Sequence, residues 1–353
     1  METSRRLDYD VVMATRNRPE AVALSLPLLT AQSRPPARIV IVDSSEDGAP
    51  IEALARKADA GGPVPVTYMR GPGGLTLQRN LGLARCTAPV VIFPDDDSLL
   101  YPDAAERMME VYEADAAGAI AAVCARPAET PPPASGLALD TVAAEKMTGP
   151  RLAARRLRQR IKERLAPLNP FLAVGDALNA RHPLPGWAAG MAVKPVPYMT
   201  GFRMSFRRDA IDAARFDEVL LRYAWFEDID ASFRVMRAGA VVVAERAGIY
   251  HHRVAASRAN GRTMGLWAIL NRGYVVMKSV DANPQVFDRD RERRRLRLYC
   301  RARTLAYRAL ARGQFGRDRA AGARAALAQL DELTALKGPA LEARYREMTR
   351  DAD

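Results

Sequence analysis

The sequence predicts an α/β fold built around a mainly parallel sheet that is flanked by helices. Five short apolar runs recur about every 25–30 residues, with helical segments between them, which is the pattern of consecutive βαβ units. A chain of 353 residues, of which 48% are hydrophobic and 27% charged, is large enough to bury the core of such a sheet. Polar residues follow several of the apolar runs directly, and this is where ligands bind in parallel sheets.

The N-terminal part alternates regularly between strands and helices. Continuous apolar runs predict buried strands at 9–14, 38–42, 66–70, 90–93 and 119–124. Helices are predicted at 19–29, 51–60, 75–84 and 102–113. Proline suits the first turn of a helix, so Pro19 and Pro102 mark two of these starts, whereas Pro27 is unfavourable inside a helix.

The regular alternation stops after residue 126. A proline-rich stretch at 127–133 predicts a surface loop, and 151–164 (RLAARRLRQRIKER) predicts a basic amphipathic helix. Later segments are expected to return to the sheet and then to become helical: a sheet segment at 199–206, a helix within 222–237 with Gly239 after its end, a last strand at 241–244, and helices at 266–277 and 291–330.

Charge divides the chain into an acidic and a basic part. Residues 1–140 contain 13 basic and 19 acidic residues, a net charge of −6. Residues 141–353 contain the other 40 basic and 22 acidic residues, a net charge of +18. A basic surface of this kind attracts nucleic acid, an anionic membrane or a phosphorylated ligand, and the charge alone does not choose among them.

Several classes of protein do not fit the sequence. No window approaches the ~18–20 uninterrupted apolar residues of a membrane span, and residues 1–10 are charged, unlike a secretory signal. The three cysteines, Cys86, Cys124 and Cys300, are too scattered for a disulfide framework or a Cys-x-x-Cys metal site. We therefore expect a cytoplasmic protein, with peripheral contact to the inner face of the cell membrane through its basic part.

Three consecutive aspartates, Asp95, Asp96 and Asp97, form the strongest local signal. They follow the apolar run VVIF at a predicted strand end, and adjacent carboxylates repel one another unless a cation neutralises them. Carboxylate oxygens are the ligands that Mg²⁺ and Mn²⁺ prefer. The motif therefore predicts a divalent-metal site, with a solvated acidic turn as the alternative.

The motifs taken together resemble a known enzyme family. The segments VVMATRNRPE, IVIVDSS, LTLQRNLGLA, VVIFPDDDS, GFRMSFRR and EDIDASFR, followed by YHHR, are similar in order and spacing to those of family-2 glycosyltransferases. The resemblance extends over roughly residues 9–253 and implies the GT-A fold, a Rossmann-like sheet flanked by helices. It also implies inverting transfer of a sugar from a nucleotide-diphosphate donor.

The resemblance implies a role for individual residues in donor binding. The nucleotide contacts carried over from the family are Thr15, Arg16, Asn17, Asp43, Arg79, Asp95 and Asp96. Asp43 would contact the base and Asp96 the ribose. The family often has a second acid after the first, where this chain has Ser44, so base selectivity stays open. Asn17 as a helix cap and Arg79 as a solvated helix charge are the alternatives.

The implied metal ligands are Asp97, Asp95 and His251. Asp97 is expected to bind the ion directly, and His251 is preferred to its neighbour His252 as the imidazole that completes the site. The expected cofactor is Mn²⁺ or Mg²⁺, which would offset the charge on the leaving phosphates.

The implied catalytic pair is Glu227-Asp228, at the start of a predicted helix. Inverting sugar transfer needs a base that takes the proton of the acceptor hydroxyl, and this role is assigned to Asp228. Glu227 and Asp230 are supporting candidates. Acidic residues are also favoured at helix starts by the helix dipole, which is the purely structural alternative.

These observations predict a domain plan and a function. Residues 1–253 are expected to form the GT-A domain, with a nucleotide-binding part at about 1–126 and an acceptor part at about 127–253, and 254–353 a basic helical extension. The predicted reaction transfers a sugar to a hydroxyl of a glycan or lipid-linked acceptor in surface polysaccharide synthesis. The sequence leaves the sugar, the base, the acceptor and the oligomeric state open.

Three rival functions make different predictions. A nucleotidyltransferase would need a glycine-rich loop with a lysine near the first strand, and TRNRPE has neither. A nucleic-acid-binding protein would use the basic part and bind with a strong salt dependence, but aromatic residues for base stacking are sparse. An inactive donor-binding scaffold would not need the complete Asp95–Asp97 and Glu227-Asp228 motifs.

Overall fold

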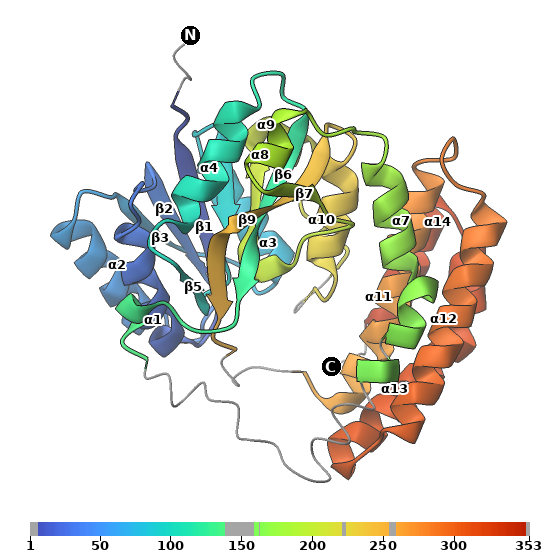
Figure 1. Ribbon diagram of the computed structural model, residues 1–353. Helices are drawn as coiled ribbons and strands as arrows, with labels where there is room; N and C mark the ends of the chain where they lie inside the picture. Colours follow the sequence, from blue (N-terminus) through green and yellow to red (C-terminus); the bar gives the residue numbers. More distant parts are fainter. Residues whose placement is uncertain (1–5, 138–158, 162, 221–223, 254–258, 351–353) are drawn as a thin grey trace. The chain divides into compact units, whose positions relative to one another are not determined.

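The chain folds into two compact units, seen in a computed structural model (Figure 1). The structure describes residues 6–137, 159–161, 163–220, 224–253 and 259–350. Unit 1 contains Met1–Ala143 and Asn179–Ser257, and unit 2 contains Ala144–Leu178 and Arg258–Asp353. Part of the segment predicted to bind the acceptor thus packs in unit 2, and the functional division at residue 253 stays a prediction.

Unit 1 is built on a nine-stranded sheet in the order β3-β2-β1-β4-β8-β6-β9-β5, with β7 also paired to β9. The strands are β1 (Tyr9–Thr15), β2 (Arg38–Asp43), β3 (Val66–Arg70), β4 (Val90–Phe93), β5 (Ser98–Leu100), β6 (Ile120–Ala128), β7 (Val193–Pro195), β8 (Met204–Arg207) and β9 (Ala240–His251). The α/β prediction is confirmed, because helices flank this central sheet (Figure 1).

The first four strands form the parallel part of the sheet. β1 pairs in parallel with both β2 and β4, and β2 pairs in parallel with β3. The register places Thr15 opposite Asp43, so both polar strand ends lie at the same edge. The runs of β1, β2 and β4 are almost completely buried, whereas in β3 only Val66 is buried. The four strand predictions are confirmed to within one residue at each end.

The second half of the sheet is mixed. β8 pairs antiparallel with β4 and β6, while β5 and β7 pair antiparallel with β9. β6 and β9 are parallel neighbours. The predicted return of 199–206 to the sheet is confirmed for its last three residues, because Gly201–Arg203 forms a short 3-10 helix before β8 begins.

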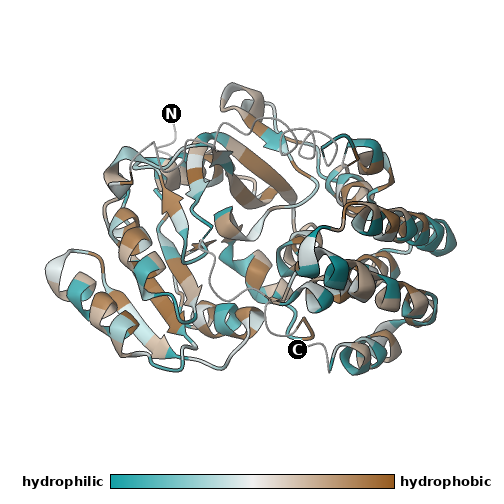
Figure 2. Cartoon of the chain, turned by 90° about the horizontal axis from the view of Figure 1, so that it is seen from below, coloured by the Kyte–Doolittle hydropathy of each residue, from teal (hydrophilic) through white to brown (hydrophobic). Residues whose placement is uncertain are grey.

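Helices pack on the sheet and close the core of unit 1. They are α1 (Pro19–Thr30), α2 (Ala49–Gly61), α3 (Leu75–Leu83), α4 (Ala104–Ala114), α8 (Trp187–Gly190), α9 (Arg208–Ala214) and α10 (Glu227–Val235). Pro27 lies inside α1 as the sequence indicated, near the end of the helix. Val11, Ile41 and Ile92 belong to the main hydrophobic cluster. The hydropathy colouring shows the sheet strands as largely hydrophobic (Figure 2).

Two predicted boundaries in unit 1 are wrong. Residues 127–133 were expected to be loop, yet β6 continues through Pro127 to Ala128. β8 pairs only with residues 122–124 of β6, so Pro127 needs no hydrogen bond on that side of the strand. The last strand, expected at 241–244, continues to His251 across charged residues, with a bulge where its register with β6 shifts.

Unit 2 is helical among the residues described. It contains α7 (Pro170–Asn179, whose last residue belongs to unit 1), α11 (Gly261–Asp281), α12 (Arg289–Ala309), α13 (Gly313–Ala335) and α14 (Gly338–Thr349). The helical prediction for 291–330 is confirmed except at a break between α12 and α13, where the first helix ends at Ala309 and Gly313 adopts a φ of 63°. α11 and α13 approach closely: a methyl group on Gly265 would overlap the carbonyl oxygen of Arg319.

Some predictions fall on residues that are not described. Of the basic helix predicted at 151–164, residues 159–161 and 163–164 are helical, and 151–158 and 162 lie outside the described residues. Residues 221–223, at the start of the helix region predicted at 222–237, also lie outside them. Within the described part of the chain, no helix combines the length and the hydrophobicity needed to span a membrane.

Candidate active site

The predicted site residues gather where β1, β2 and β4 end. Ala14 forms a parallel bridge with Asp95, which fixes the aspartate motif beside the end of β1. The carboxamide of Gln78, on α3, donates to the carbonyl oxygens of Thr15 at 2.9 Å and Val42 at 2.8 Å. Gln78 is buried, so one side chain holds the two strand ends together. No feature of the sequence singles out this glutamine.

Asp96 points into the protein. Its carboxylate accepts hydrogen bonds from the Thr15 hydroxyl at 2.9 Å and from Arg18 at 3.0 Å. Burial raises the pKa of Asp96 to about 7, although the Arg18 guanidinium lowers it. Thr15 and Asp96, both predicted to contact the nucleotide, thus bind each other in this structure. Arg18, which the sequence analysis did not select, lies in the same TRNR loop.

Asp97 and His251 lie next to each other. The Nε2 atom of His251 is 3.2 Å from Asp97 Oδ1, and the backbone N–H of His252 donates to the Asp97 carbonyl oxygen at 3.0 Å. The pairing of β5 with β9 places Ser98 opposite His251 and thereby brings the two motifs together. The His251 ring stacks on Phe202 with 4.5 Å between the ring centroids. His252 thus contacts Asp97 through its backbone N–H, whereas His251 faces the Asp97 carboxylate with its imidazole ring.

Asp95, Asp97 and His251 form a group that suits a divalent metal ion. Each offers one ligand atom, and these atoms all lie within 4.8 Å of one another. The Asp95 side chain is 29% exposed and that of His251 28% exposed, so an ion could reach both. Two carboxylates and one imidazole are a suitable donor set for Mn²⁺ or Mg²⁺. The residues present therefore fit the predicted cofactor.

Arg79 joins the aspartate motif to the predicted catalytic pair. Its Nη1 atom donates to Glu227 Oε1 at 2.6 Å and its Nη2 atom to Asp95 Oδ1 at 2.9 Å. The side chain is 2% exposed, and its guanidinium lies over the Phe216 ring. The alternative of a solvated helix charge is wrong, since Arg79 is an internal bridge. Its assignment as a nucleotide contact stays a prediction.

Asp228 is fixed by backbone donors at the start of α10. Its carboxylate accepts from the N–H groups of Gly201 at 2.9 Å and Ile229 at 2.8 Å. Burial raises the pKa of both Asp228 and Glu227, while Arg79 and, for Asp228, the backbone hydrogen bonds oppose the shift. Phe226, just before the helix, adopts a φ of 81°, which is strained for a residue with a side chain.

Gly201 leaves room for the charged cluster. A Cβ atom at this position would lie 3.3 Å from both Arg79 Nη2 and Glu227 Oε1. Any larger side chain would push against the bridge between the two motifs. Gly201 lies in the GFRMSFRR segment that contributed to the resemblance, but sequence reasoning assigned it no role. Asp230, a supporting candidate, is buried, and its carboxylate lies 3.7 Å from Arg234 on the same helix.

The remaining nucleotide candidates lie at the ends of β1 and β2. Asp43 is fully buried; one oxygen accepts from Ser45, and the other accepts from Tyr68 at 2.9 Å and Arg70 at 3.1 Å. Arg16 is exposed and paired with Glu46. Asn17 has a φ of 54° and binds the loop after β2 instead of capping α1, whose N-cap is Arg18. The helix-cap alternative for Asn17 is therefore wrong.

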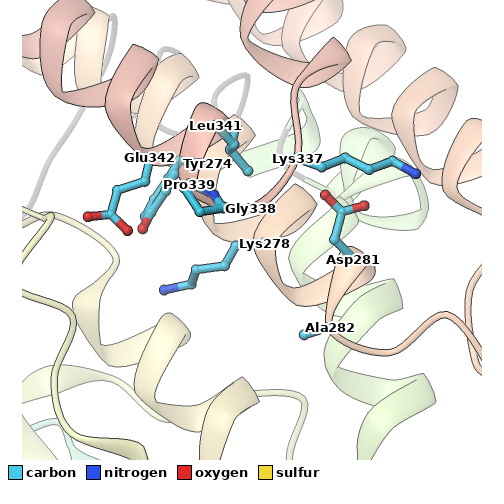
Figure 3. A pocket seen from close by; sticks show the side chains of 9 residues that line it. All are labelled: Tyr274, Lys278, Asp281, Ala282, Lys337, Gly338, Pro339, Leu341 and Glu342. Atoms are coloured by element: carbon cyan, nitrogen blue, oxygen red, sulfur yellow. The ribbon is translucent and has the colours of Figure 1, made fainter.

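A separate pocket of about 540 Å³ lies within unit 2. It is lined by residues of α11 and α14 and the link before α14, and contains none of the predicted site residues (Figure 3). Two lysines, Lys278 and Lys337, and two acids, Asp281 and Glu342, give it a balanced charge. Asp281 is held by Arg289 at 2.6 Å. This lining selects neither an anion nor a cation.

Comparisons with known proteins agree with the fold and with the motifs. The family model for glycosyl transferase family 2 matches residues 10–173. The structure is similar to the mannosyltransferase PcManGT from Pyrobaculum calidifontis, solved in complex with GDP-Man and Mn²⁺, with a TM-score of 0.50 and 15% identity. That match covers 98% of this chain and 86% of the other chain. No curated protein matches the sequence at a significant level.

A second solved structure is less similar. GalNAc-T7, solved with UDP, GalNAc and Mn²⁺, matches with a TM-score of 0.48 and 13% identity, over 78% of this chain and 52% of its own. The likeness to PcManGT confirms the predicted fold class. The match of the glycosyl transferase family 2 model to residues 10–173 confirms the resemblance drawn from the motifs.

Proposed function

We propose that this protein is an inverting glycosyltransferase that moves a sugar from a nucleotide-diphosphate donor to a hydroxyl acceptor. One observation carries the proposal: Arg79 ties the aspartate motif to Glu227-Asp228, across 148 residues of sequence, at the end of the parallel strands. A metal-ligand group and a carboxylate pair thus share one site, and the family match over residues 10–173 supports glycosyl transfer as its activity.

The proposed donor site uses the loops after β1, β2 and β4. Thr15, Arg16 and Asn17 would bind the nucleotide from the first loop, with Asp43 at the base and Asp95 and Asp96 at the ribose and phosphates. Arg79 would contact the nucleotide only after a rearrangement, since its guanidinium now binds two carboxylates.

A divalent metal ion is proposed at Asp97, Asp95 and His251. When bound, the ion would offset negative charge on the diphosphate leaving group. The stacking of His251 on Phe202 holds the imidazole in place for this role, and the contact of Arg18 with Asp97, at 3.6 Å, limits the repulsion between the aspartates. Mn²⁺ and Mg²⁺ both suit the donor set.

Asp228 is proposed as the base. The acceptor hydroxyl would give its proton to the Asp228 carboxylate while its oxygen bonds to the anomeric carbon. The bond between the anomeric carbon and the phosphate oxygen breaks on the opposite face, and the nucleoside diphosphate leaves. A buried carboxylate is a stronger base than a solvated one, which suits this role. Glu227 would hold Arg79, and through it Asp95, in position.

For the acceptor we propose a class: a hydroxyl of a glycan or of a lipid-linked sugar, in the synthesis of a surface polysaccharide. The family resemblance supports this class. The described structure adds no group that selects one acceptor within it.

The test is a thermal-shift screen with UDP, GDP, dTDP and CDP, each with and without Mn²⁺ or Mg²⁺, followed by an assay of nucleotide release from the matching sugar donors. We expect one nucleotide to raise the melting temperature in a metal-dependent way. Asp97→Ala should lose the metal dependence, whereas Asp212→Ala, which replaces a partly exposed acid on α9, should keep it.

Other outcomes would favour the rivals. Metal-dependent nucleotide binding without any transfer or donor cleavage would support the inactive scaffold. Salt-sensitive binding of DNA or RNA, with no shift by any nucleotide, would support the nucleic-acid-binding protein. An unchanged metal response in Asp97→Ala would remove Asp97 from the metal site.

A further inference from the structure

One face of α12 carries an exposed row of arginines interrupted by leucines. Six residues follow one another at spacings of three and four, which places them on one face of the helix. All six are exposed, and together they are called the α12 stripe: Arg291, Arg294, Leu298, Arg301, Leu305 and Arg308. We propose that the α12 stripe binds the surface of an anionic lipid bilayer.

The opposite face of α12 fixes the helix in unit 2. Leu296, Tyr299, Cys300 and Tyr307 are buried on that face. Arg293 donates to the Asp331 carbonyl oxygen at 2.8 Å, and Arg297 pairs with the Asp331 carboxylate at 2.9 Å, so two arginines outside the stripe anchor α12 to α13. The stripe is therefore presented by a packed helix of 21 residues.

The charge of α12 favours an anionic partner. The helix contains nine arginines and two acidic residues. Both acids, Asp290 and Glu292, lie in its first turn, and Glu292 pairs with Arg295. Among the described residues, no carboxylate forms an ion pair with Arg294, Arg301 or Arg308. These three arginines are free to attract phosphate groups of a lipid surface.

The leucines distinguish a bilayer from other anionic partners. Leu298 is 54% exposed and Leu305 is 64% exposed, and with Phe315, which follows just inside α13, they are the large hydrophobic residues exposed in the described chain. Arginine beside exposed leucine is the composition of helices that lie in a membrane interface, where leucine enters the acyl boundary. Nucleic acid would gain nothing from the leucines, and the stripe has no aromatic residue to stack on bases.

The proposal goes beyond the proposed sugar transfer and does not depend on it. Vesicle binding is measured without donor, acceptor or metal, so failure of one proposal leaves the other standing. The stripe also lies wholly within unit 2, whereas the candidate active-site residues belong to unit 1.

The experiment is co-sedimentation of the full-length protein with sucrose-loaded vesicles at about 100 mM salt, where screening is strong but not complete. Vesicles of phosphatidylcholine alone are compared with vesicles containing about 30% phosphatidylglycerol, the anionic component that arginine is expected to bind. The variants are R294Q/R301Q/R308Q and L298S/L305S. A matched control, R317Q/R324Q/R346Q, removes three exposed arginines from α13 and α14.

We expect the wild type to bind the anionic vesicles and not the neutral ones. The arginine variant should lose more than about tenfold in partitioning. The leucine variant should lose about threefold to tenfold and become more sensitive to salt. The control should bind like the wild type, and circular dichroism should show that all variants keep their helical content.

Several results would overturn the proposal. They are equal partitioning to neutral vesicles, no partitioning at about 100 mM salt, or a control variant that loses as much as the arginine variant. A fluorescence anisotropy titration with duplex and single-stranded DNA completes the test. DNA binding that depends on the three stripe arginines, without vesicle binding, would assign the stripe to nucleic acid instead.

Discussion

One buried arginine, Arg79, determines how the charged residues of the site are arranged. Its guanidinium contacts Asp95 and Glu227, which come from different motifs. Burying a charge is costly unless it is paired, so each partner depends on the others. Gly201 allows this arrangement, because a side chain there would push against Arg79. The site is thus held together by its own ion pairs.

Replacement of Arg79 by methionine is expected to destabilise the protein by about 3 kcal/mol or more, because two largely buried carboxylates lose their cation. Urea unfolding of the metal-free protein measures the effect. Arg56→Met is the control: Arg56 pairs with Glu52 at 2.6 Å on the exposed surface, and its loss should cost less than about 1 kcal/mol. Similar losses of unfolding free energy in both variants would show that the buried bridge stabilises the protein no more than an exposed ion pair does.

Asp228→Asn is expected to reduce transfer by about 10²–10⁴-fold, since a positioned base typically contributes this much. Nucleotide binding should change little, because the asparagine carbonyl can still accept one of the two backbone hydrogen bonds. Nucleotide release under saturating donor measures the rate, and thermal shift measures the binding. Full activity would exclude Asp228 as the base, and loss of nucleotide binding would point to a structural role. Asp209→Asn, on α9, serves as the control.

Among the secondary-structure elements, β9 has the largest part in assembling the site. It follows α10 directly along the chain, so it starts near the end of the helix that carries Glu227-Asp228 and finishes at His251. Its pairing with β5 then sets His251 beside the aspartate motif. The proposed catalytic pair and the proposed metal ligand His251 are therefore connected by a single helix–strand unit.

The sequence predicted those elements whose pattern is local. The runs YDVVMA, RIVIV and VVIF are buried except for Ala14 and Arg38, which are partly exposed, and the sequence predicts their strands to within a residue. β5 has only three residues and carries too little pattern to be recognised. The predicted last strand ends too early, at residue 244, because Glu245 and Arg246 interrupt the apolar run of β9 at the bulge. The sequence predicts a loop at Pro127 because local sequence does not reveal which side of a strand is unpaired.

The site residues were predictable as motifs, but their contacts were not. Asp95, Asp97, His251 and Glu227-Asp228 stand out by residue type and position in the motifs. The bridge through Arg79 joins residues 148 positions apart, and only the folded sheet brings them together. Gln78 and Gly201 act through a carboxamide and through the absence of a side chain, and neither has a signature in a single sequence.

The packing of α11 against α13 leads to a prediction for unit 2. Gly265→Ala is expected to destabilise the protein by about 1–3 kcal/mol, because the new methyl group would overlap the backbone of Arg319 and force the helices apart. Thermal unfolding followed by circular dichroism measures the loss. Gly61→Ala, at the end of α2 with nothing within 4 Å of its added Cβ, is the control and should be neutral or stabilising. If Gly265→Ala melts like the control, the two helices do not require this close approach.

The complete chain crosses between its two units more than once, since unit 2 takes one segment from the middle of the sequence and one from its end. Arg272 of α11 lies over the Phe171 ring of α7, 4.1 Å from its centroid, and also contacts Asn169. The C-terminal helices are thus packed onto a segment that lies in the sequence between the two parts of unit 1. They are not a simple appendage to the chain.

A chain that ends at residue 257 should therefore expose apolar surface. Phe171 and Val174 are buried in the full chain and would lose the helices of unit 2 that follow. We expect this truncated protein to bind the dye ANS and to self-associate, as measured by fluorescence and size-exclusion chromatography. The same truncation with Phe171→Ser and Val174→Ser should bind less dye. A monodisperse truncated chain without dye binding would contradict this expectation.

The bulge in β9 has a consequence for how this protein can change over evolutionary time. Along a strand, an added or lost residue turns every following side chain to the other face, so most length changes between α10 and His251 would remove the imidazole from the aspartates. Near Glu245, where the register with β6 already shifts, an extra residue can be absorbed without that inversion. Descendants of this gene should accumulate insertions there, and elsewhere in β9 they should vary by substitution alone.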